Sequence, residues 1–264
     1  MVIVDGPNFL IVPGDPQSHV ILHVPHSSRV IPVDVRAKIL LDDEQLRQEL
    51  DEMTDSLTDS LATESANRAN RKPWLFVNSL SRLVIDPERF PDERESMNEV
   101  GMGAVYTKTS AGEVLRLPSP TEEEALLKSY FHPYAAALSH LVGERLHANG
   151  VVTIVDVHSY RPIAHPNGIN HNQQRPALCI GTDQFHTPEK LITGLKQAFQ
   201  GIGSIVENEP YGGTYVPLDY YEKDSAVSSV MAEIRADTFL NPNLSINEGF
   251  EKVVSALSQF VDQI

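Results

Sequence analysis

The segment from Val151 to Ser159 constrains the fold of this chain more than any other feature of the sequence. It reads Val-Val-Thr-Ile-Val-Asp-Val-His-Ser, a β-branched run that ends in Asp156, His158 and Ser159. Such a run is typical of a strand that is buried on both faces of a sheet. Polar groups at the carboxyl end of such a strand lie where open α/β sheets bind their ligands. The segment therefore predicts an α/β fold with its chemistry at one edge of the sheet.

A second segment, near the amino terminus, repeats this pattern. The residues from His19 to Val24 form an apolar strand, which opens into a loop that carries His26, Ser27 and Ser28. A single histidine is more often a core residue bonded to the backbone than a metal ligand. Two histidines at the ends of two strands, His26 and His158, favour a divalent metal held at the edge of one sheet.

Length and charge limit the class of protein. A chain of 264 residues with 41% hydrophobic content can form one large α/β domain or two small ones, and we predict a single domain over residues 1–264. The net charge of −15 argues against nucleic acid or an anionic membrane as partner, because both require clustered Lys and Arg. A few local arginines can still build a cationic pocket, so the net charge leaves the charge of a small substrate open.

Cysteine content and the amino-terminal residues predict a cytoplasmic protein. The single cysteine, Cys179, lies in an apolar run and cannot form an internal disulfide, so we expect a buried and inert thiol. Residues 1–10 lack a basic region followed by a long apolar segment, as a signal peptide requires. No apolar stretch approaches the roughly 20 residues that a membrane helix needs.

Strand and helix patterns alternate along the chain. Short strands are expected at residues 75–77, 83–85, 177–180 and 228–234, and helices at 188–199 and near the carboxyl terminus, where Ser245 and Glu248 would form a capping box. One helix should begin near Asp42 and carry the apolar stripe Leu46, Leu50, Met53, Leu57 and Leu61. Another should run from a Ser119 N-cap to about His147. This alternation predicts a three-layer αβα architecture with a mostly parallel, mixed sheet.

Two polar segments without periodicity interrupt this alternation. Residues 87–118 are rich in Pro, Gly, Met and charge, and we predict an ordered loop that borders the site. Residues 161–175 form a second polar loop, in which the segment from His165 to His171 is a candidate lining of the pocket.

A hydrolytic zinc site needs three protein ligands, commonly two histidines and one carboxylate, and leaves the fourth position to water. The carboxylate must come from an element near the His26 loop. Asp51 and Asp55 lie one turn apart at the margin of the apolar stripe of the first helix, where an unpaired carboxylate is costly and a metal offsets that cost. The alternative is that both are ordinary solvated helix residues.

Glu233 and two arginines complete the candidate site. Apolar residues surround Glu233 in its strand, so its carboxylate should be desolvated, with a raised pKa suited to proton transfer. An ion pair with an arginine is the alternative. Arg82 and Arg89 flank the short strand at residues 83–85 and are suited to bind a carboxylate or to polarise an amide oxygen. The alternative for either is a structural ion pair, for example with Asp86.

Taken in order, these motifs resemble those of N-formylglutamate amidohydrolases. The resemblance covers about residues 20–240 and is carried by Pro25-His26-Ser27-Ser28, the acidic helix with Asp51 and Asp55, Ser81-Arg82-Leu83-Val84-Ile85-Asp86, His132-Pro133-Tyr134, Asp156-Val157-His158-Ser159, Tyr211-Gly212-Gly213 and Glu233. It implies a zinc-dependent amidohydrolase of the phosphorylase/hydrolase-like αβα fold, distantly related to zinc carboxypeptidases and aspartoacylases.

Residue by residue, the resemblance implies a role for each part of the site. It makes His26, Asp51 and His158 the metal ligands, with Asp51 preferred over Asp55 by the spacing of the helix motif, and Glu233 the general base. Arg82 would stabilise the oxyanion. The substrate-binding residues that it implies are Arg89, Tyr134, Ser159, Gly212 and Gly213.

The sequence departs from the family pattern at two positions. Arg29 stands where related carboxypeptidases have the Glu of His-x-x-Glu, so the carboxylate ligand must come from the helix. The motif Asp-x-Asn-Arg, which binds the substrate carboxylate, reads Asp86-Pro87-Glu88-Arg89 here. Glu88 adds a negative charge near that carboxylate, which argues against formylglutamate itself as the substrate.

Three functions follow as hypotheses. The first is a hydrolase that uses Zn²⁺ or another divalent metal to cleave the amide of an N-formyl or short N-acyl amino acid, a small-molecule substrate. The second is a peptidase or aspartoacylase-like deacylase with the same metal, in which Glu88 and Arg89 select a zwitterionic or amine-bearing substrate. The third is a non-catalytic metal-binding domain, in which Glu233 would be structurally paired and remote from the metal.

Overall fold

A single mixed sheet organises the molecule, and its strand order is β1-β2-β4-β3-β5-β8-β6-β7. The computed structural model describes residues 4–168 and 172–264. The strands are β1 (Val4–Asp5), β2 (Phe9–Val12), β3 (Val20–Val24), β4 (Trp74–Asn78), β5 (Val152–Tyr160), β6 (Leu178–Gly181), β7 (Ile205–Glu207) and β8 (Val227–Arg235). The central strands β4, β3, β5 and β8 run parallel to one another, and β2 and β6 flank them as antiparallel neighbours.

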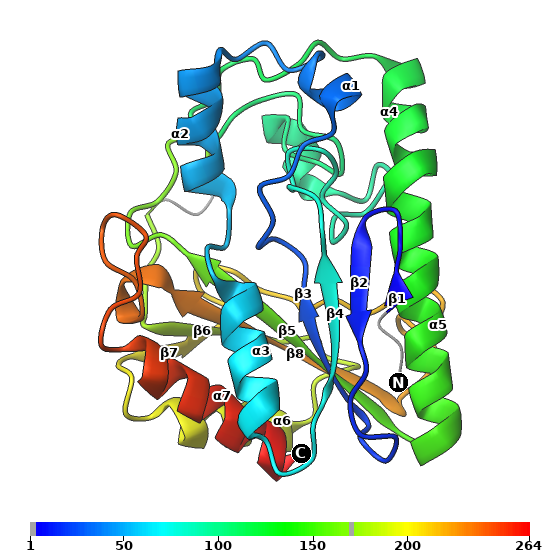
Figure 1. Ribbon diagram of the computed structural model, residues 1–264, viewed down its shortest axis with the longest axis vertical. Coiled ribbons are helices and arrows are strands. Elements are labelled where there is room, and N and C mark those ends of the chain that lie inside the picture. Colours follow the sequence, from blue (N-terminus) through cyan, green and yellow to red (C-terminus); the bar gives the residue numbers. More distant parts are fainter. Residues whose placement is uncertain (1–3, 169–171) are drawn as a thin grey trace.

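Helices cover both faces of this sheet, so the predicted three-layer αβα architecture is confirmed (Figure 1). The helices are α1 (Val33–Arg36), α2 (Asp43–Met53), α3 (Thr58–Arg68), α4 (Pro120–Leu126), α5 (His132–Asn149), α6 (Glu189–Phe199) and α7 (Phe250–Gln263), with short turns η1 (Ser96–Val100), η2 (Leu127–Phe131) and η3 (Ala236–Thr238). Apolar side chains of α3, α6 and α7 pack on one face, and those of α5 pack on the other.

The side-chain alternation of the strands separates an apolar face from a face that becomes polar. On the α3/α6/α7 face, β5 contributes Val155 and Val157 to the larger apolar cluster. On the α5 face, β5 begins with Val152 and Ile154 in the smaller cluster and then presents Asp156 and His158. Because successive residues of a strand point to opposite faces, Asp156 and His158 share the α5 face.

The same switch occurs on the neighbouring strands. Ile21 of β3 belongs to the α5-face cluster, and His23 follows two residues later in register with Asp156. On β8, Glu233 pairs in register with His158, so the two side chains lie on the same face of adjacent strands. The topology alone therefore brings His23, Asp156, His158 and Glu233 to one corner of the sheet.

Three local predictions were wrong. The stripe expected on one long helix is divided between α2 and α3, because the chain breaks between Met53 and Thr58. Residues 83–85 form no strand, because residues 82–84 make a turn, and Leu83, Val84 and Ile85 are buried in three different apolar clusters. The carboxyl-terminal helix begins at Phe250 with Gly249 as N-cap, so no capping box of Ser245 and Glu248 starts it.

Other predicted elements are confirmed. The Ser119 side chain accepts a hydrogen bond from the Glu122 backbone N–H, which caps α4, and one π turn, η2, joins α4 to α5. Cys179 is buried in β6. Among residues 4–168 and 172–264, no helix has both the length and the apolar character that crossing a bilayer would require.

Candidate metal centre and active site

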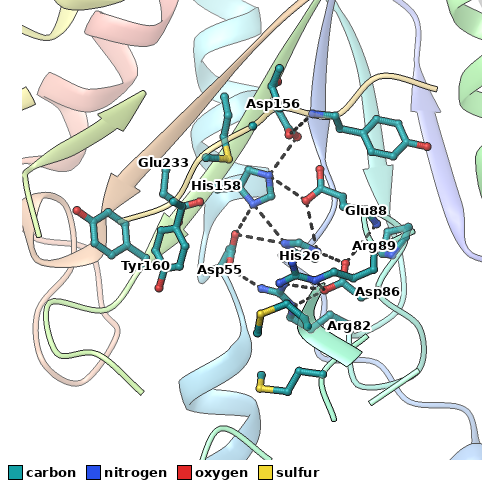
Figure 2. Close-up of a pocket in the computed structure, with 18 of the residues that line it drawn as sticks. His26, Asp55, Arg82, Asp86, Glu88, Arg89, Asp156, His158, Tyr160 and Glu233 are labelled. Atoms are coloured by element: carbon teal, nitrogen blue, oxygen red, sulfur yellow. Dashed lines mark hydrogen bonds and ion pairs between the residues drawn. The ribbon is translucent and has the colours of Figure 1, made fainter. Parts of the chain in front are cut away.

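A cavity of about 700 Å³ opens at the carboxyl ends of β3, β5 and β8. Its walls come from the segment that joins α2 to α3, the predicted loop after residue 87, and the polar ends of the strands. The prediction that this loop borders the site is thus confirmed. Figure 2 shows that the charged side chains gather at the floor of the cavity, with His26 and His158 at the centre.

Three donor atoms converge there from separate elements. His26 Nδ1 lies 3.2 Å from His158 Nδ1, and Asp55 Oδ2 lies 3.0 Å from His158 Nδ1 and 3.7 Å from His26 Nδ1. All three residues are buried. His26 follows β3, His158 lies on the polar face near the carboxyl end of β5, and Asp55 occupies the break between α2 and α3.

This arrangement fits a divalent metal. Ligand atoms at the 2.0–2.2 Å distances of tetrahedral zinc are separated from one another by about 3.3–3.6 Å, which is close to the three separations found here. Two imidazole nitrogens that face each other across 3.2 Å cannot both carry a proton, whereas two lone pairs can share one cation. Two imidazoles and one carboxylate are also a common catalytic zinc set.

A hydrogen bond to Asp86 orients the His26 ring. His26 Nε2 donates to Asp86 Oδ1 at 2.9 Å, which leaves the Nδ1 lone pair for a metal. Burial alone would raise the pKa of Asp86, but Arg82 and His26 hold it well below its usual value, so the carboxylate stays charged. Asp86 therefore acts as the outer carboxylate of a carboxylate–histidine–metal arrangement.

The Nε2 atom of His158, which points away from Asp55 and His26, faces two carboxylates. His158 Nε2 lies 3.2 Å from Asp156 Oδ1 and 3.2 Å from Glu88 Oε2, without hydrogen-bond geometry to either oxygen. Asp156 is itself held by the His23 ring at 2.8 Å and by the Tyr215 backbone N–H at 3.2 Å. A proton on Nε2 of His158 is thus favoured, and its Nδ1 lone pair faces Asp55 and His26.

His23 extends this network into the core. Its Nδ1 donates to Asp156 and its Nε2 lies 2.6 Å from the Tyr134 hydroxyl, which can donate to it. Tyr134 is fully buried, and burial raises the pKa of its hydroxyl well above the usual value. A continuous chain of polar contacts therefore connects α5 through Tyr134, His23 and Asp156 to His158.

The choice of Asp51 as ligand is corrected by this geometry. Asp51 lies on the partly exposed side of α2 and pairs with Arg29 Nη1 at 2.7 Å and with Arg47 Nη1 at 3.2 Å. Because α2 ends at Met53, Asp55 does not continue the helical face of Asp51. Instead, the Asp55 backbone N–H donates to the His26 carbonyl oxygen, and its carboxylate accepts the Ser159 backbone N–H at 3.2 Å.

Glu233 lies beside this centre as a buried acid. Its side chain is on the same sheet face as His158, and Figure 2 shows it next to the His158 ring. It forms no hydrogen bond or ion pair with another residue of the described ranges. Burial, only partly opposed by His158, raises the pKa of Glu233 to about 7, so the carboxyl can take up and release a proton near neutral pH.

Arg82 and Arg89 both lie at the floor of the cavity, where they meet Asp86. Arg82 Nη2 lies 2.7 Å from Asp86 Oδ2, and its Nη1 lies 3.7 Å from Asp55 Oδ1. Arg89 Nε lies 3.5 Å from Asp86 Oδ2. The alternative of an ion pair with Asp86 is therefore observed for both, although both side chains also line the cavity. The Tyr106 hydroxyl donates to the same oxygen at 2.7 Å.

The other predicted substrate-binding residues divide into two groups. Gly212 and Gly213 line the cavity, and Gly213 adopts a φ of +84°, which favours glycine. Ser159 also lines it, but its hydrogen bond supports the Asp55 carboxylate. Tyr134 is wrong as a substrate ligand, because its side chain is sealed in the core and bonds His23.

Several site residues escaped the sequence reasoning or received other roles. Asp86, Glu88 and Asp156 supply the carboxylates around the three imidazoles, and Asp156 carried a signal as a strand-end acid beside His158. His165 lines the cavity, as considered above, and burial together with nearby arginines lowers its pKa to about 4. His171, from the same predicted loop, lies outside the described residues.

Known proteins offer three comparisons. A crystal structure of N-formylglutamate amidohydrolase from Ralstonia eutropha superposes with a TM-score of 0.78 at 20% identity, covering 97% of this chain and 96% of that one. A gene product from Agrobacterium tumefaciens gives a TM-score of 0.66 at 20% identity, with 97% and 94% coverage. At this identity the two structures establish the fold alone. A search of curated proteins gave no significant match. The family model for N-formylglutamate amidohydrolase matches residues 18–240, and the chain therefore belongs to the N-formylglutamate amidohydrolase family.

Proposed function

We propose that this protein is a divalent-metal amidohydrolase that removes a formyl or short acyl group from the nitrogen of an amino-acid-like compound. Family membership supports hydrolysis of a linear amide. The observation that carries metal dependence is the convergence of His26 Nδ1, His158 Nδ1 and Asp55 Oδ2 in a buried corner of the cavity, with Glu233 beside them. We propose Zn²⁺ as the ion, held by His26, Asp55 and His158.

The metal and the protein divide the chemistry. A divalent ion at this position supplies Lewis acidity, which polarises an amide carbonyl and lowers the pKa of water to roughly 7. The protein holds that ion with neutral imidazoles, because Asp86 fixes the tautomer of His26 while Asp156 and Glu88 favour a proton on the far nitrogen of His158.

Glu233 and Arg82 perform the remaining steps. Glu233 takes a proton from the attacking water and passes it to the leaving nitrogen, a role suited to a carboxyl whose pKa is about 7. Arg82 directs its Nη1 into the cavity near Asp55, where it stabilises the negative charge that develops on the amide oxygen. Burial lowers the pKa of Arg82, but Asp86 outweighs that effect and raises it well above the usual value, so its charge is permanent.

The position of Glu233 also separates this proposal from a non-catalytic metal-binding domain. Such a domain would pair Glu233 structurally and keep it away from the metal ligands. Glu233 instead stands in register with His158 on the same face of the sheet, without an ion-pair partner among the described residues.

Glu233→Gln tests the proposal. The substitution keeps the shape of the side chain but removes proton transfer, so metal content should persist while turnover of the best N-formyl or N-acyl amino acid falls by about 10²- to 10⁴-fold. Metal analysis and steady-state kinetics measure the two effects. Glu248→Gln, at an exposed acid outside the cavity, is the matched control and should change neither.

Two results would contradict this assignment. A rate near that of the wild type excludes Glu233 as the base. Loss of metal together with activity would make Glu233 a ligand, and Asp55 would then have to be withdrawn from the ligand set.

A further inference from the structure

The cavity is unusually acidic for a site that would receive a carboxylate. Among the described residues that line it, nine are acidic and five are arginines, and none is a lysine. One bound divalent ion would still leave the carboxylates in excess.

Most of these arginines already have carboxylate partners. Arg82 pairs with Asp86 at 2.7 Å, and Arg94 pairs with Asp92 at 2.6 Å. Arg161 lies 3.4 Å from Glu52. Arg175 donates to the Arg161 carbonyl oxygen at 2.7 Å, so one of its N–H groups is already bonded to the backbone.

Arg89, the arginine that the family motif assigns to a substrate carboxylate, is also engaged. Its Nε lies 3.5 Å from Asp86 Oδ2 and its Nη1 lies 3.7 Å from Glu95 Oε1. A carboxylate that approached Arg89 would therefore meet two carboxylates already in place, and Glu88 is the residue immediately before Arg89. Like charges brought together in a partly buried site oppose binding.

Glu88 lies at the centre of this imbalance. Its Oε2 is 3.2 Å from His158 Nε2, and its Oε1 is 3.5 Å from His23 Nδ1, whose proton goes to Asp156. Within the described residues Oε1 is consequently a buried acceptor without a hydrogen bond, and it belongs to a side chain that lines the cavity. A buried acceptor of this kind gains most from a ligand that brings an N–H or ammonium donor.

The charges next to the metal ligands balance before any substrate arrives. Among the groups in direct polar contact with His26, His158 or Asp86, the four carboxylates Asp55, Asp86, Glu88 and Asp156 face the guanidinium groups of Arg82 and Arg89 and one divalent ion, so their formal charges cancel before the neighbouring Glu233 is counted. With the Asn of the family motif in place of Glu88, the same centre would keep one positive charge, which complements a substrate carboxylate. Glu88 removes that charge.

From this geometry we infer that Glu88 directs the cavity away from substrates with a free carboxylate beside the scissile amide. It favours N-acyl compounds that present an uncharged or positively charged hydrogen-bond donor there, such as an amino-acid amide. This inference rests on the proposed amidohydrolase function and specifies its substrate class.

A series of three compounds tests it: N-formylglutamate with two carboxylates, N-formylglutamine with one, and N-formylglutamine amide with none. The kcat/KM of the zinc-loaded wild type should rise from N-formylglutamine to its amide, the step that removes the carboxylate beside the scissile amide, and N-formylglutamate reports the added effect of the side-chain carboxylate. Glu88→Gln should shift the ratio of kcat/KM values, N-formylglutamine amide over N-formylglutamine, toward N-formylglutamine by about 10- to 100-fold. A ratio within one protein cancels any effect of the substitution on metal affinity. Glu93→Gln, an exposed acid of the same loop outside the cavity, removes the same charge and should leave the ratio unchanged.

Binding supplies a readout that is independent of turnover. Calorimetric titration of the three compounds into the zinc-loaded Glu233→Gln protein, with and without Glu88→Gln, gives the same charge preference as dissociation constants. If the amide binds most tightly but the wild type turns over none of the three compounds, the role of Glu88 is supported and the amidohydrolase proposal is overturned. Turnover with glutamate preferred, or a ratio that Glu88→Gln leaves unchanged, would overturn the role of Glu88 alone. Failure to bind any of the three would overturn both.

Discussion

The two faces of the central sheet are built from the same strands but differ in what they bury. On the α3/α6/α7 face, β3 contributes Val20, Leu22 and Val24, and the central parts of β5 and β8 also contribute apolar side chains to the largest apolar cluster of the described residues. The α5 face is apolar only at the amino-terminal half of these strands, after which it presents His23, Asp156, His158 and Glu233. Within one strand, the residues that point to one face thus pack in the core, and the residues that point to the other face form the candidate site.

This difference shows how a chain can bury so many charged groups. Ionised side chains inside a protein are costly unless each has a partner of opposite charge or a metal. The apolar face supplies the burial that stabilises the sheet, so the polar face does not have to. We therefore expect substitutions on the polar face to change metal binding and activity, and substitutions on the apolar face to change stability.

The largest effect should come from the carboxylate ligand. Asp55→Asn removes a negative charge from the metal site, and the metal affinity should fall by more than the roughly 10- to 100-fold that loss of an outer-shell partner typically causes. Asp51→Asn, only four residues away, should leave the affinity unchanged and alter stability by about 0–1 kcal/mol, because Asp51 forms only surface ion pairs. Competition titration with a chelator measures both. Equal losses would mean that the break between α2 and α3 does not separate these residues.

Truncation of a side chain on the apolar face should lower the stability of the protein and leave its activity unchanged. Leu61 of α3 is fully buried in the larger cluster, so Leu61→Ala should lower the free energy of unfolding by about 2–5 kcal/mol. Urea denaturation of the metal-free protein measures this loss. The kcat/KM of the folded, metal-loaded variant should equal that of the wild type, and a large fall in kcat/KM would show that the two faces are coupled.

The smallest effect concerns pH. Burial lowers the pKa of both His26 and His158, but the surrounding carboxylates outweigh burial and raise both pKa values above the ordinary value, that of His158 strongly. In the metal-free protein only one of the two facing Nδ1 atoms can carry a proton at a time. The protonated ring contributes stability below about pH 6.5, and this contribution is lost as the pH rises through its raised folded pKa.

Metal binding must displace this proton, so its affinity should rise with pH by about tenfold per unit for each proton released. Calorimetric titration of zinc in buffers of different ionisation enthalpy counts the protons. An affinity that does not depend on pH would contradict the assignment of the two rings as ligands.

The sequence predicts the apolar face better than the polar one. The β-branched run of β5 and the stripes of the packed helices are local signals, and they lead directly to a parallel sheet with helices on both faces. His26 and His158 were found for the same reason, because each stands at a strand end. Glu88 and Asp86 were harder to place, since they take up their positions only after residues 79–118 have folded over the sheet.

The error at Asp51 has a physical origin. Both Asp51 and Asp55 fit the margin of one continuous helix, and the spacing of Leu50, Met53 and Leu57 supports that interpretation. A helix break leaves little trace in such a pattern when no glycine or proline marks it. Only tertiary contacts, such as the hydrogen bond from the Asp55 backbone to His26, decide between the two carboxylates.

The break that frees Asp55 places a leucine in a left-handed conformation. Leu57 caps α3 with a φ of +63°, a conformation that costs a residue with a Cβ about 1–2 kcal/mol. Substitutions that join α2 and α3 into one continuous helix across residues 53–58 would relieve this strain. They would also turn Asp55 away from His26 and His158. In laboratory evolution of the protein, a screen for thermal stability alone would therefore enrich inactive variants at this connection, and selection for activity would have to be applied together with it.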